Sequence, residues 1–221
     1  MKKSAWAAAI AVAVALHTPQ RSQAAFIVGN LDQATANNSN AIQFNSMYFA
    51  QEFNVGSQSY TLSSIMALLG NQISPTTNFA KLVTDSGGAP GTQVVANFTF
   101  PTVPTANPGS NVEFDPTASG VTLAANTNYW FVLESTAGTG FYEWGFVGPT
   151  LTAGSVGTLG SLEKSVDNGA TWIPESGTAK GMIQVNGTPL GPSVPEPSSL
   201  ILMGLGGAIG IGAWLRRCRQ G

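Results

Sequence analysis

The sequence predicts an all-β fold, an antiparallel β-sandwich of the jelly-roll type, for a body that spans residues 26–190. Short apolar or alternating runs recur along the body and are separated by clusters of Gly, Pro, Asn, Asp and Ser. Such runs are typical of strands, and the clusters of turns. The body has no long amphipathic pattern of helical period. Many short strands with closely spaced turns favour two packed sheets.

The expected strands follow one another with short connections. They lie at residues 41–55, 60–69, 79–84, 93–100, 111–114, 128–133, 141–147, 166–172 and 180–185. The run 128–133 is the most hydrophobic and is predicted to be central. In the run 141–147, alternation places Phe141 and Glu143 on one face and Tyr142 and Trp144 on the other. One of these two pairs is therefore expected in the core.

The N-terminus has the pattern of a signal peptide. Lys2 and Lys3 are followed by an apolar run at residues 5–16, and small residues precede a cleavage position after Ala24. We expect residues 1–24 to form a signal helix that signal peptidase removes, with cleavage after Ala25 as the alternative.

The C-terminus is predicted to hold a membrane anchor. Residues 191–199 form a Pro-rich, extended linker, and residues 200–215 are apolar and uncharged, somewhat short of the ~20 residues that a spanning helix needs. Snorkelling of the arginines in the basic tail, residues 216–221, could make up the difference. The positive-inside rule places this tail in the cytoplasm.

These three C-terminal parts resemble the PEP-CTERM sorting signal of Gram-negative bacteria. The resemblance implies recognition by an exosortase, a membrane cysteine transpeptidase, with processing near Pro195-Glu196-Pro197. It also implies export across the inner membrane, transient anchoring, and delivery to the cell surface or extracellular matrix. The alternative is an ordinary glycine-rich anchor that stays in the bilayer. The residues that carry the signal are Val194, Pro195, Glu196, Pro197, Arg216, Arg217 and Arg219.

The charge of the body excludes several partners. Its only basic residues are Lys81, Lys164 and Lys180, against ten acidic residues, which gives a net charge of about −7. Nucleic acids and anionic lipids require a basic face, so neither is expected to bind.

The cysteine and histidine counts exclude several chemistries. Cys218 and His17 are the only residues of their kinds, and both lie outside the body. The body can therefore form no disulfide, no Ser-His-Asp triad, no Cys-His pair and no zinc site of Cys and His.

One local motif is sharply defined. The segment 165–172 fits the pattern S-x-D-x-G-x-T-W through Ser165, Asp167, Gly169 and Trp172. Asp167 can accept hydrogen bonds from the amides that follow it, and Gly169 can adopt a positive φ. The pattern resembles the Asp-box, a hairpin of sialidases and of many non-catalytic extracellular β proteins. A structural hairpin is favoured over a ligand site.

The body as a whole resembles the choice-of-anchor domains that accompany PEP-CTERM tails, and the R-type is the best match. The segments that carry this resemblance are 60–65, 85–91, 120–123, 128–133 and the surroundings of Trp172. It implies a fold more than a biochemical role.

Three kinds of chemistry remain open to the body. Glu134 and Glu143, with Glu52 as a third candidate, could form the carboxylate pair of a glycan hydrolase. Acidic residues in or beside turns could hold a structural calcium ion; these are Asp85, Glu113, Asp115 and Asp167. Exposed aromatic rings could stack on sugars; the candidates are Trp130, Tyr142, Trp144 and Trp172.

The sequence therefore predicts an exported, non-enzymatic surface or matrix protein, without cofactors, that is structural or adhesive and binds extracellular polysaccharide weakly. A carboxylate-dependent glycan hydrolase and a passive coat protein without ligand are the alternatives.

Overall fold

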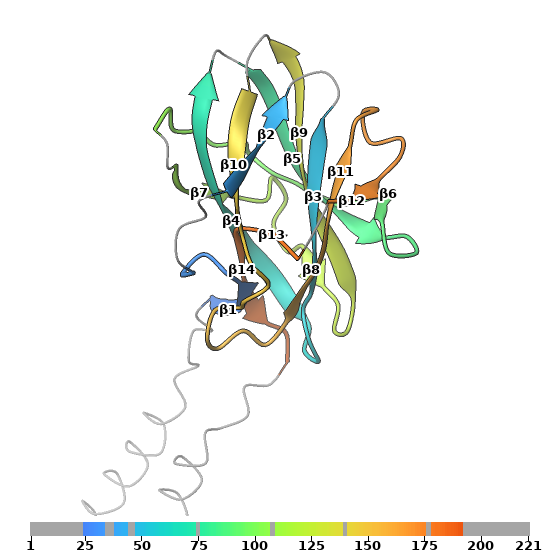
Figure 1. The fold of residues 1–221 in the computed structure, drawn as a ribbon. Coiled ribbons are helices and arrows are strands. Elements are labelled where there is room, and N and C mark those ends of the chain that lie inside the picture. The colour runs from blue at the N-terminus through green and yellow to red at the C-terminus, as the bar shows by residue number, and fades with distance from the viewer. Residues whose placement is uncertain are drawn as a thin grey trace, which may run out of the picture. The chain divides into compact units, whose positions relative to one another are not determined.

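The computed structural model describes residues 24–33, 38–43, 47–73, 76–106, 109–138, 141–175 and 178–191. These residues form strands, turns and loops, and no helix occurs among them. The strands make two antiparallel sheets (Figure 1). The predicted all-β architecture with two packed sheets is confirmed, and the jelly-roll connectivity stays a prediction.

One sheet has eight strands and the other six. The eight-stranded sheet contains β1 (Ala25–Gly29), β14 (Ile183–Pro189), β4 (Tyr60–Ile73), β10 (Phe141–Val147) and β13 (Lys180–Gly181) in spatial order, with β2 (Asn38–Gln43), β7 (Ser110–Phe114) and β8 (Thr122–Leu123) paired to β10 or β4. The six-stranded sheet has the order β12 (Ile173–Pro174), β11 (Thr158–Ser165), β3 (Tyr48–Asn54), β9 (Asn128–Gly138), β5 (Thr76–Asp85) and β6 (Pro90–Asn97).

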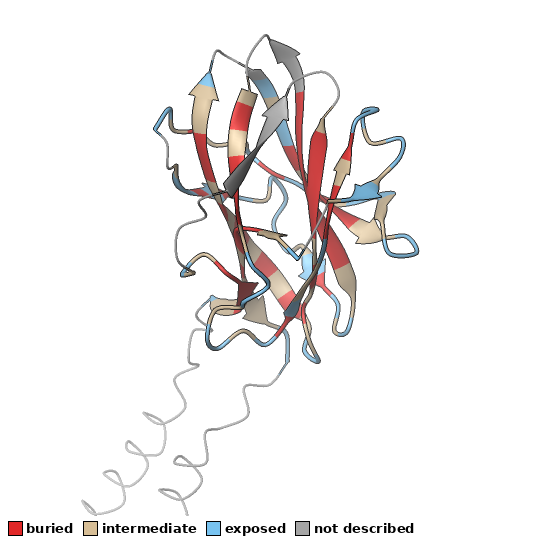
Figure 2. Ribbon diagram, viewed as in Figure 1, coloured by how far each residue is buried: buried red, intermediate tan, exposed pale blue. Residues whose placement is uncertain are grey.

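Strand β9 is central, as its hydrophobicity predicts, because it lies between β3 and β5. Its residues alternate between two apolar clusters. Phe131 and Leu133 belong to the main core between the sheets, and Trp130 and Val132 to a second cluster on the opposite face. Both faces of β9 are therefore covered, and Figure 2 shows buried residues along the strands of this sheet and exposed residues in the loops.

Aromatic rings fill the main core and join the two sheets. Phe131 of β9 contacts Phe114 of β7 and Trp144 of β10, with ring centroids 5.2 and 6.1 Å apart. All three rings are fully buried. In β10, Tyr142 and Trp144 face this core whereas Phe141 and Glu143 are only partly covered, which confirms the predicted alternation.

Two buried amide side chains bond to the backbone around β13, and one of them, Gln51, connects the two sheets. The side chain of Gln51 in β3 accepts a hydrogen bond from the Gly181 amide at 2.8 Å. The side chain of Asn30 accepts one from the Ile183 amide and donates one to the Gly181 carbonyl. Gly181 has no room for a side chain, since a Cβ there would lie 2.7 Å from Cζ2 of Trp144. Both polar side chains are fully buried, and each both donates and accepts hydrogen bonds.

The first and last strands of the body pair with each other. Ala25 lies opposite Gly187 and Gly29 opposite Gln184 in the antiparallel β1–β14 ladder. Ile27 and Val28 are fully buried, so β1 is an integral part of the sheet.

The predicted targeting segments fall outside this description. The signal peptide (1–24), the linker (191–199), the transmembrane segment (200–215) and the basic tail (216–221) lie beyond the described residues, apart from Ala24 and Gly191. Over the described ranges, no helix is long and apolar enough to cross a membrane.

Candidate functional site

The outer face of the six-stranded sheet carries a second apolar cluster, here called the outer cluster. It consists of Ala50, Val83, Trp130 and Val132, with the partly exposed Trp172 packed against it. Trp130 is fully buried, and its indole N–H donates a hydrogen bond to Oδ1 of Asp85 at 2.8 Å. Trp172 comes from the loop between β11 and β12, so a segment distant in sequence covers the middle of the sheet.

The loop that carries Trp172 is held by side-chain hydrogen bonds. Asp167 accepts one bond from the Thr171 amide at 2.8 Å and one from the Thr171 hydroxyl at 2.6 Å. The Ser165 hydroxyl donates to Asp167 and accepts from the Gly169 amide. Gly169 has a φ of +80°, and a Cβ at this position would contact the rings of Tyr48 and Trp172. The four residues of the sequence motif therefore meet in one hairpin, and the resemblance to an Asp-box remains a prediction.

These bonds lower the pKa of Asp167 from 3.8 to about 2, the Thr171 hydroxyl being the largest cause, followed by the Thr171 amide and the Ser165 hydroxyl. Because the folded-state pKa is depressed, the ionised carboxylate stabilises the hairpin above pH 3.8, and this contribution is lost as the pH falls through about 2. We expect Thr171→Val to return the Asp167 pKa toward 3.8. A ¹³C NMR titration of the carboxyl group would measure it.

The control for this titration is Thr122→Val, which replaces an exposed threonine on β8 in the other sheet. It should leave the Asp167 titration unchanged. An Asp167 pKa that stays near its wild-type value in Thr171→Val would show that the Thr171 hydroxyl is not the main cause of the lowered pKa.

The predicted aromatic set does not form a surface. Trp130, Tyr142 and Trp144 are fully buried, so none of them presents a ring to a sugar. Burial also raises the pKa of the Tyr142 hydroxyl well above its usual range, with the Glu134 charge as a further cause. The prediction was wrong for these three residues, because strand alternation gives the face of a residue but not what covers that face. Trp172 is the member of the set that remains partly accessible.

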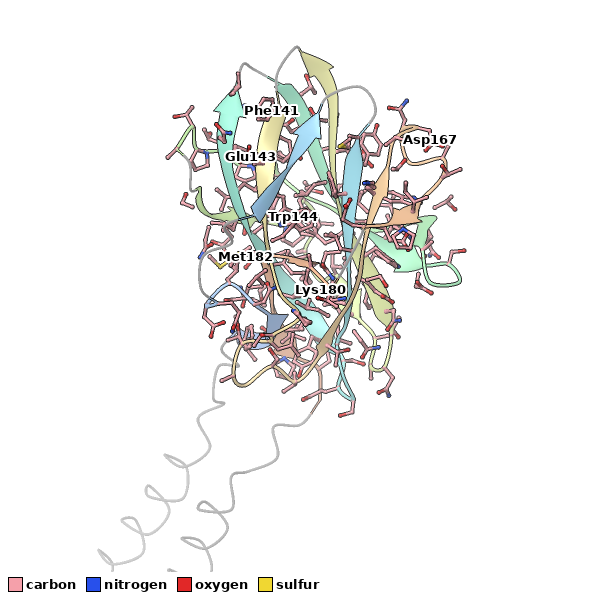
Figure 3. The ribbon with its side chains drawn as sticks, viewed as in Figure 1. Phe141, Glu143, Trp144, Asp167, Lys180 and Met182 are labelled. Atoms are coloured by element: carbon pink, nitrogen blue, oxygen red, sulfur yellow. The ribbon has the colours of Figure 1, made fainter. Side chains whose placement is uncertain are left out.

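The two predicted carboxylates lie on different sheets and have different partners. Glu134 lies on β9 in the six-stranded sheet and forms an ion pair with Lys81. Glu143 lies on β10 in the other sheet and accepts a hydrogen bond from Asn71 at 2.8 Å. Figure 3 places Glu143 on the opposite side of the body from Asp167, whose hairpin joins strands of the six-stranded sheet.

A different group of carboxylates lies on the outer face. Glu52 of β3 accepts hydrogen bonds from the Asn128 side chain and the Ser161 amide. Glu163 of β11 is 5% exposed and lies opposite Ala50 of the outer cluster. Burial raises the pKa of Glu163, and the charges of Glu52 and Asp85 raise it further. Sequence reasoning missed Glu163, because no strand was predicted at residues 158–165.

The acidic turn residues are not arranged for calcium. Asp85 bonds to Trp130 and to the Gly88 amide of its own turn, and Asp167 is engaged in its hairpin. Glu113 and Asp115 are exposed near the end of β7. Within the residues that the structure describes, no three or more Asp, Glu, His or Cys side chains are grouped so as to hold a metal ion.

A two-sheet β body followed by a polar, apolar and basic tail defines an exported protein with a sorting signal. Residues 193–217 match the family model of the PEP-CTERM protein-sorting motif. PEP-CTERM signals are recognised by exosortase, a membrane processing enzyme, so this motif implies an exported protein that exosortase sorts at the membrane. The match includes every predicted sorting residue except Arg219, which lies two positions beyond it. No curated protein matches the chain.

Proposed function

We propose that this chain is a non-enzymatic surface or matrix protein of a Gram-negative bacterium, structural or adhesive, that binds extracellular polysaccharide weakly. Signal peptidase removes residues 1–24, and exosortase processes the chain near Pro195-Glu196-Pro197. The observation that carries this proposal is the sorting motif at residues 193–217, which begins four residues after the last strand of the body ends at Pro189. The body resembles an R-type choice-of-anchor domain.

The outer face around Trp172 supports the binding part of the proposal. An aromatic ring that is partly exposed beside polar side chains is suited to a sugar, which has one apolar face and a rim of hydroxyl groups. The hydrolase alternative has less support, because Glu134 and Glu143 belong to different sheets and Glu134 is ion-paired with Lys81. A passive coat protein would need neither the Trp172 ring nor the carboxylates of the outer face for its function.

Processing can be tested directly in the host. Mass spectrometry of the mature protein should show that residues beyond Pro195-Glu196-Pro197 are missing. Replacing these three residues with alanine should leave the C-terminus intact through Gly221, because the polar part of the signal is destroyed. Pro149→Ala, at an exposed loop proline, is the matched control and should be processed normally. An intact C-terminus in the wild-type protein would contradict exosortase processing.

A further inference from the structure

One carboxyl oxygen on the outer face lacks a hydrogen-bond partner within the described residues. Oε2 of Glu163 is buried and makes no hydrogen bond to any described residue. The preceding residue, Leu162, belongs to the main core, so Glu163 points to the opposite face, where the outer cluster lies. A buried polar atom without a partner costs about 1–3 kcal/mol, and more when it is charged. Such an atom is the feature that a bound hydrogen-bond donor would satisfy.

The two acidic neighbours of Glu163, Glu52 and Asp85, accept hydrogen bonds from other groups and donate none to Glu163. Glu52 is already bonded to Asn128 and Ser161, and Asp85 to Trp130 and Gly88. Both carboxylates act on Glu163 by repulsion. Of these three carboxylates, Glu163 is therefore the one with a buried oxygen, Oε2, that can still accept a hydrogen bond.

The cations of the body are engaged elsewhere. Lys81 pairs with Glu134, Lys164 with Glu175, and Lys180 donates to the Gly160 carbonyl. A metal ion does not fit either, since the described residues hold no suitable group of three ligands. The missing partner is thus a donor that carries a single positive charge or none.

Strand register brings Trp172 to the same region of the outer face as Glu163. Glu163 is opposite Ala50 on one side and opposite Pro174 of β12 on the other. Trp172 precedes β12 by one residue and packs against the cluster that contains Ala50. A partly exposed indole ring attracts cations and the apolar faces of sugars. An amino sugar offers both an ammonium group for a carboxylate and a flat face for a ring.

We propose that Glu163 and Trp172 form a binding site for a glycan that carries free amino groups, such as a hexosamine polymer without its N-acetyl groups. The protonated amine bonds to Glu163, and the sugar face stacks on Trp172. The net charge of about −7 on the body favours such a polymer and repels polyuronates. This inference rests on the proposed glycan binding and adds the class of glycan.

The test measures binding by calorimetry to the mature protein isolated from its host, at a pH just below the pKa of the glycan amines. The ligands are a glucosamine oligomer, an N-acetylglucosamine oligomer, an oligouronate and spermidine, which has amines but no sugar ring. We expect the glucosamine oligomer to bind best, and more weakly as salt is added. Glu163→Gln should weaken its binding about ten- to hundredfold, because a charge-assisted hydrogen bond is lost. Trp172→Ala should also weaken it.

Glu113→Gln is the matched control, since it removes the same charge from an exposed position on β7 in the other sheet. It should change binding less than about twofold, as expected for a charge remote from the site. Glu163→Gln should keep or raise the melting temperature at neutral pH, because it removes a carboxylate whose pKa is raised by burial and repulsion. Weaker binding in this variant would therefore not reflect unfolding.

Other outcomes overturn the inference in distinguishable ways. If the N-acetylated and free-amine oligomers bind equally well, the protein binds glycans but Glu163 does not select for a free amino group. If spermidine binds as tightly as the glucosamine oligomer, the site recognises amines in general and the proposal of a glycan ligand is wrong. If no oligomer binds, both the proposed amine site and the proposed glycan binding are wrong. The sorting part of the proposed function is tested separately, by mass spectrometry of the C-terminus. Hydrolysis of an oligomer would replace the binding role with the hydrolase alternative.

Discussion

Trp144→Ala is expected to destabilise the body by about 3–5 kcal/mol, the usual loss for a large aromatic residue truncated in a core. The ring is fully buried, contacts Phe131 of the opposite sheet, and covers the backbone of Gly181. Its indole N–H also donates to the Met182 carbonyl at 3.1 Å, and alanine removes this bond, which leaves the Leu68 amide as the donor to that carbonyl. The midpoint of thermal unfolding should fall by roughly 10 °C or more in a domain of this size. Calorimetry of the mature protein would measure both quantities.

Phe79→Ala is the control for this substitution. Phe79 is also aromatic, but its side chain is 48% exposed on β5, so its truncation removes little buried area. We expect it to cost less than about 1 kcal/mol. If the two variants unfold at similar temperatures, Trp144 does not occupy the core position described above.

Gln51→Leu is expected to cost about 2–4 kcal/mol even though the two side chains are similar in size. The Gln51 side chain accepts a bond from the Gly181 amide of the other sheet. It also donates to backbone carbonyls of its own sheet, those of Glu52, Gly160 and Ser161. Leucine can replace none of these bonds, and each buried group left unpaired costs about 1–3 kcal/mol. Denaturant unfolding would measure the loss, and hydrogen exchange of the Gly181 amide should accelerate.

The control for this position is Gln184→Leu. Gln184 lies on β14, is only partly buried, and bonds to Asn186 of its own strand. Its side chain makes no bond between the two sheets, so its replacement should lower the free energy of unfolding by less than about 1 kcal/mol. An unchanged exchange rate at Gly181 in Gln51→Leu would refute the connecting role of Gln51.

Local periodicity predicted many of the strands, and it predicted the faces of β10, but it missed β1 and β11 and placed a strand at residues 166–172, which form a loop. The alternation in β10 correctly separated Tyr142 and Trp144 from Phe141 and Glu143, and the apolar run of β9 correctly predicted a central strand. These successes have one cause: successive side chains of a strand point to opposite faces.

What periodicity cannot predict is which segment covers a given face. Trp130 is buried on the outer face because Trp172, some forty residues later, folds over the sheet. Glu134 and Glu143 are close in sequence, but the chain crosses from one sheet to the other between their strands. The buried role of Gln51 likewise depends on a partner 130 residues away. The candidate site was therefore predicted only in part, through Trp172 and the hairpin that carries it.

The pairing of β1 with β14 has a consequence for how the body is held. Because the ladder is antiparallel, Ala25 at the start of β1 lies beside Gly187, two residues before β14 ends at Pro189. The chain thus enters and leaves the body at one pole, directly after the predicted signal peptidase site and directly before the sorting motif. Both terminal segments therefore join the body at the same end of the β1–β14 ladder.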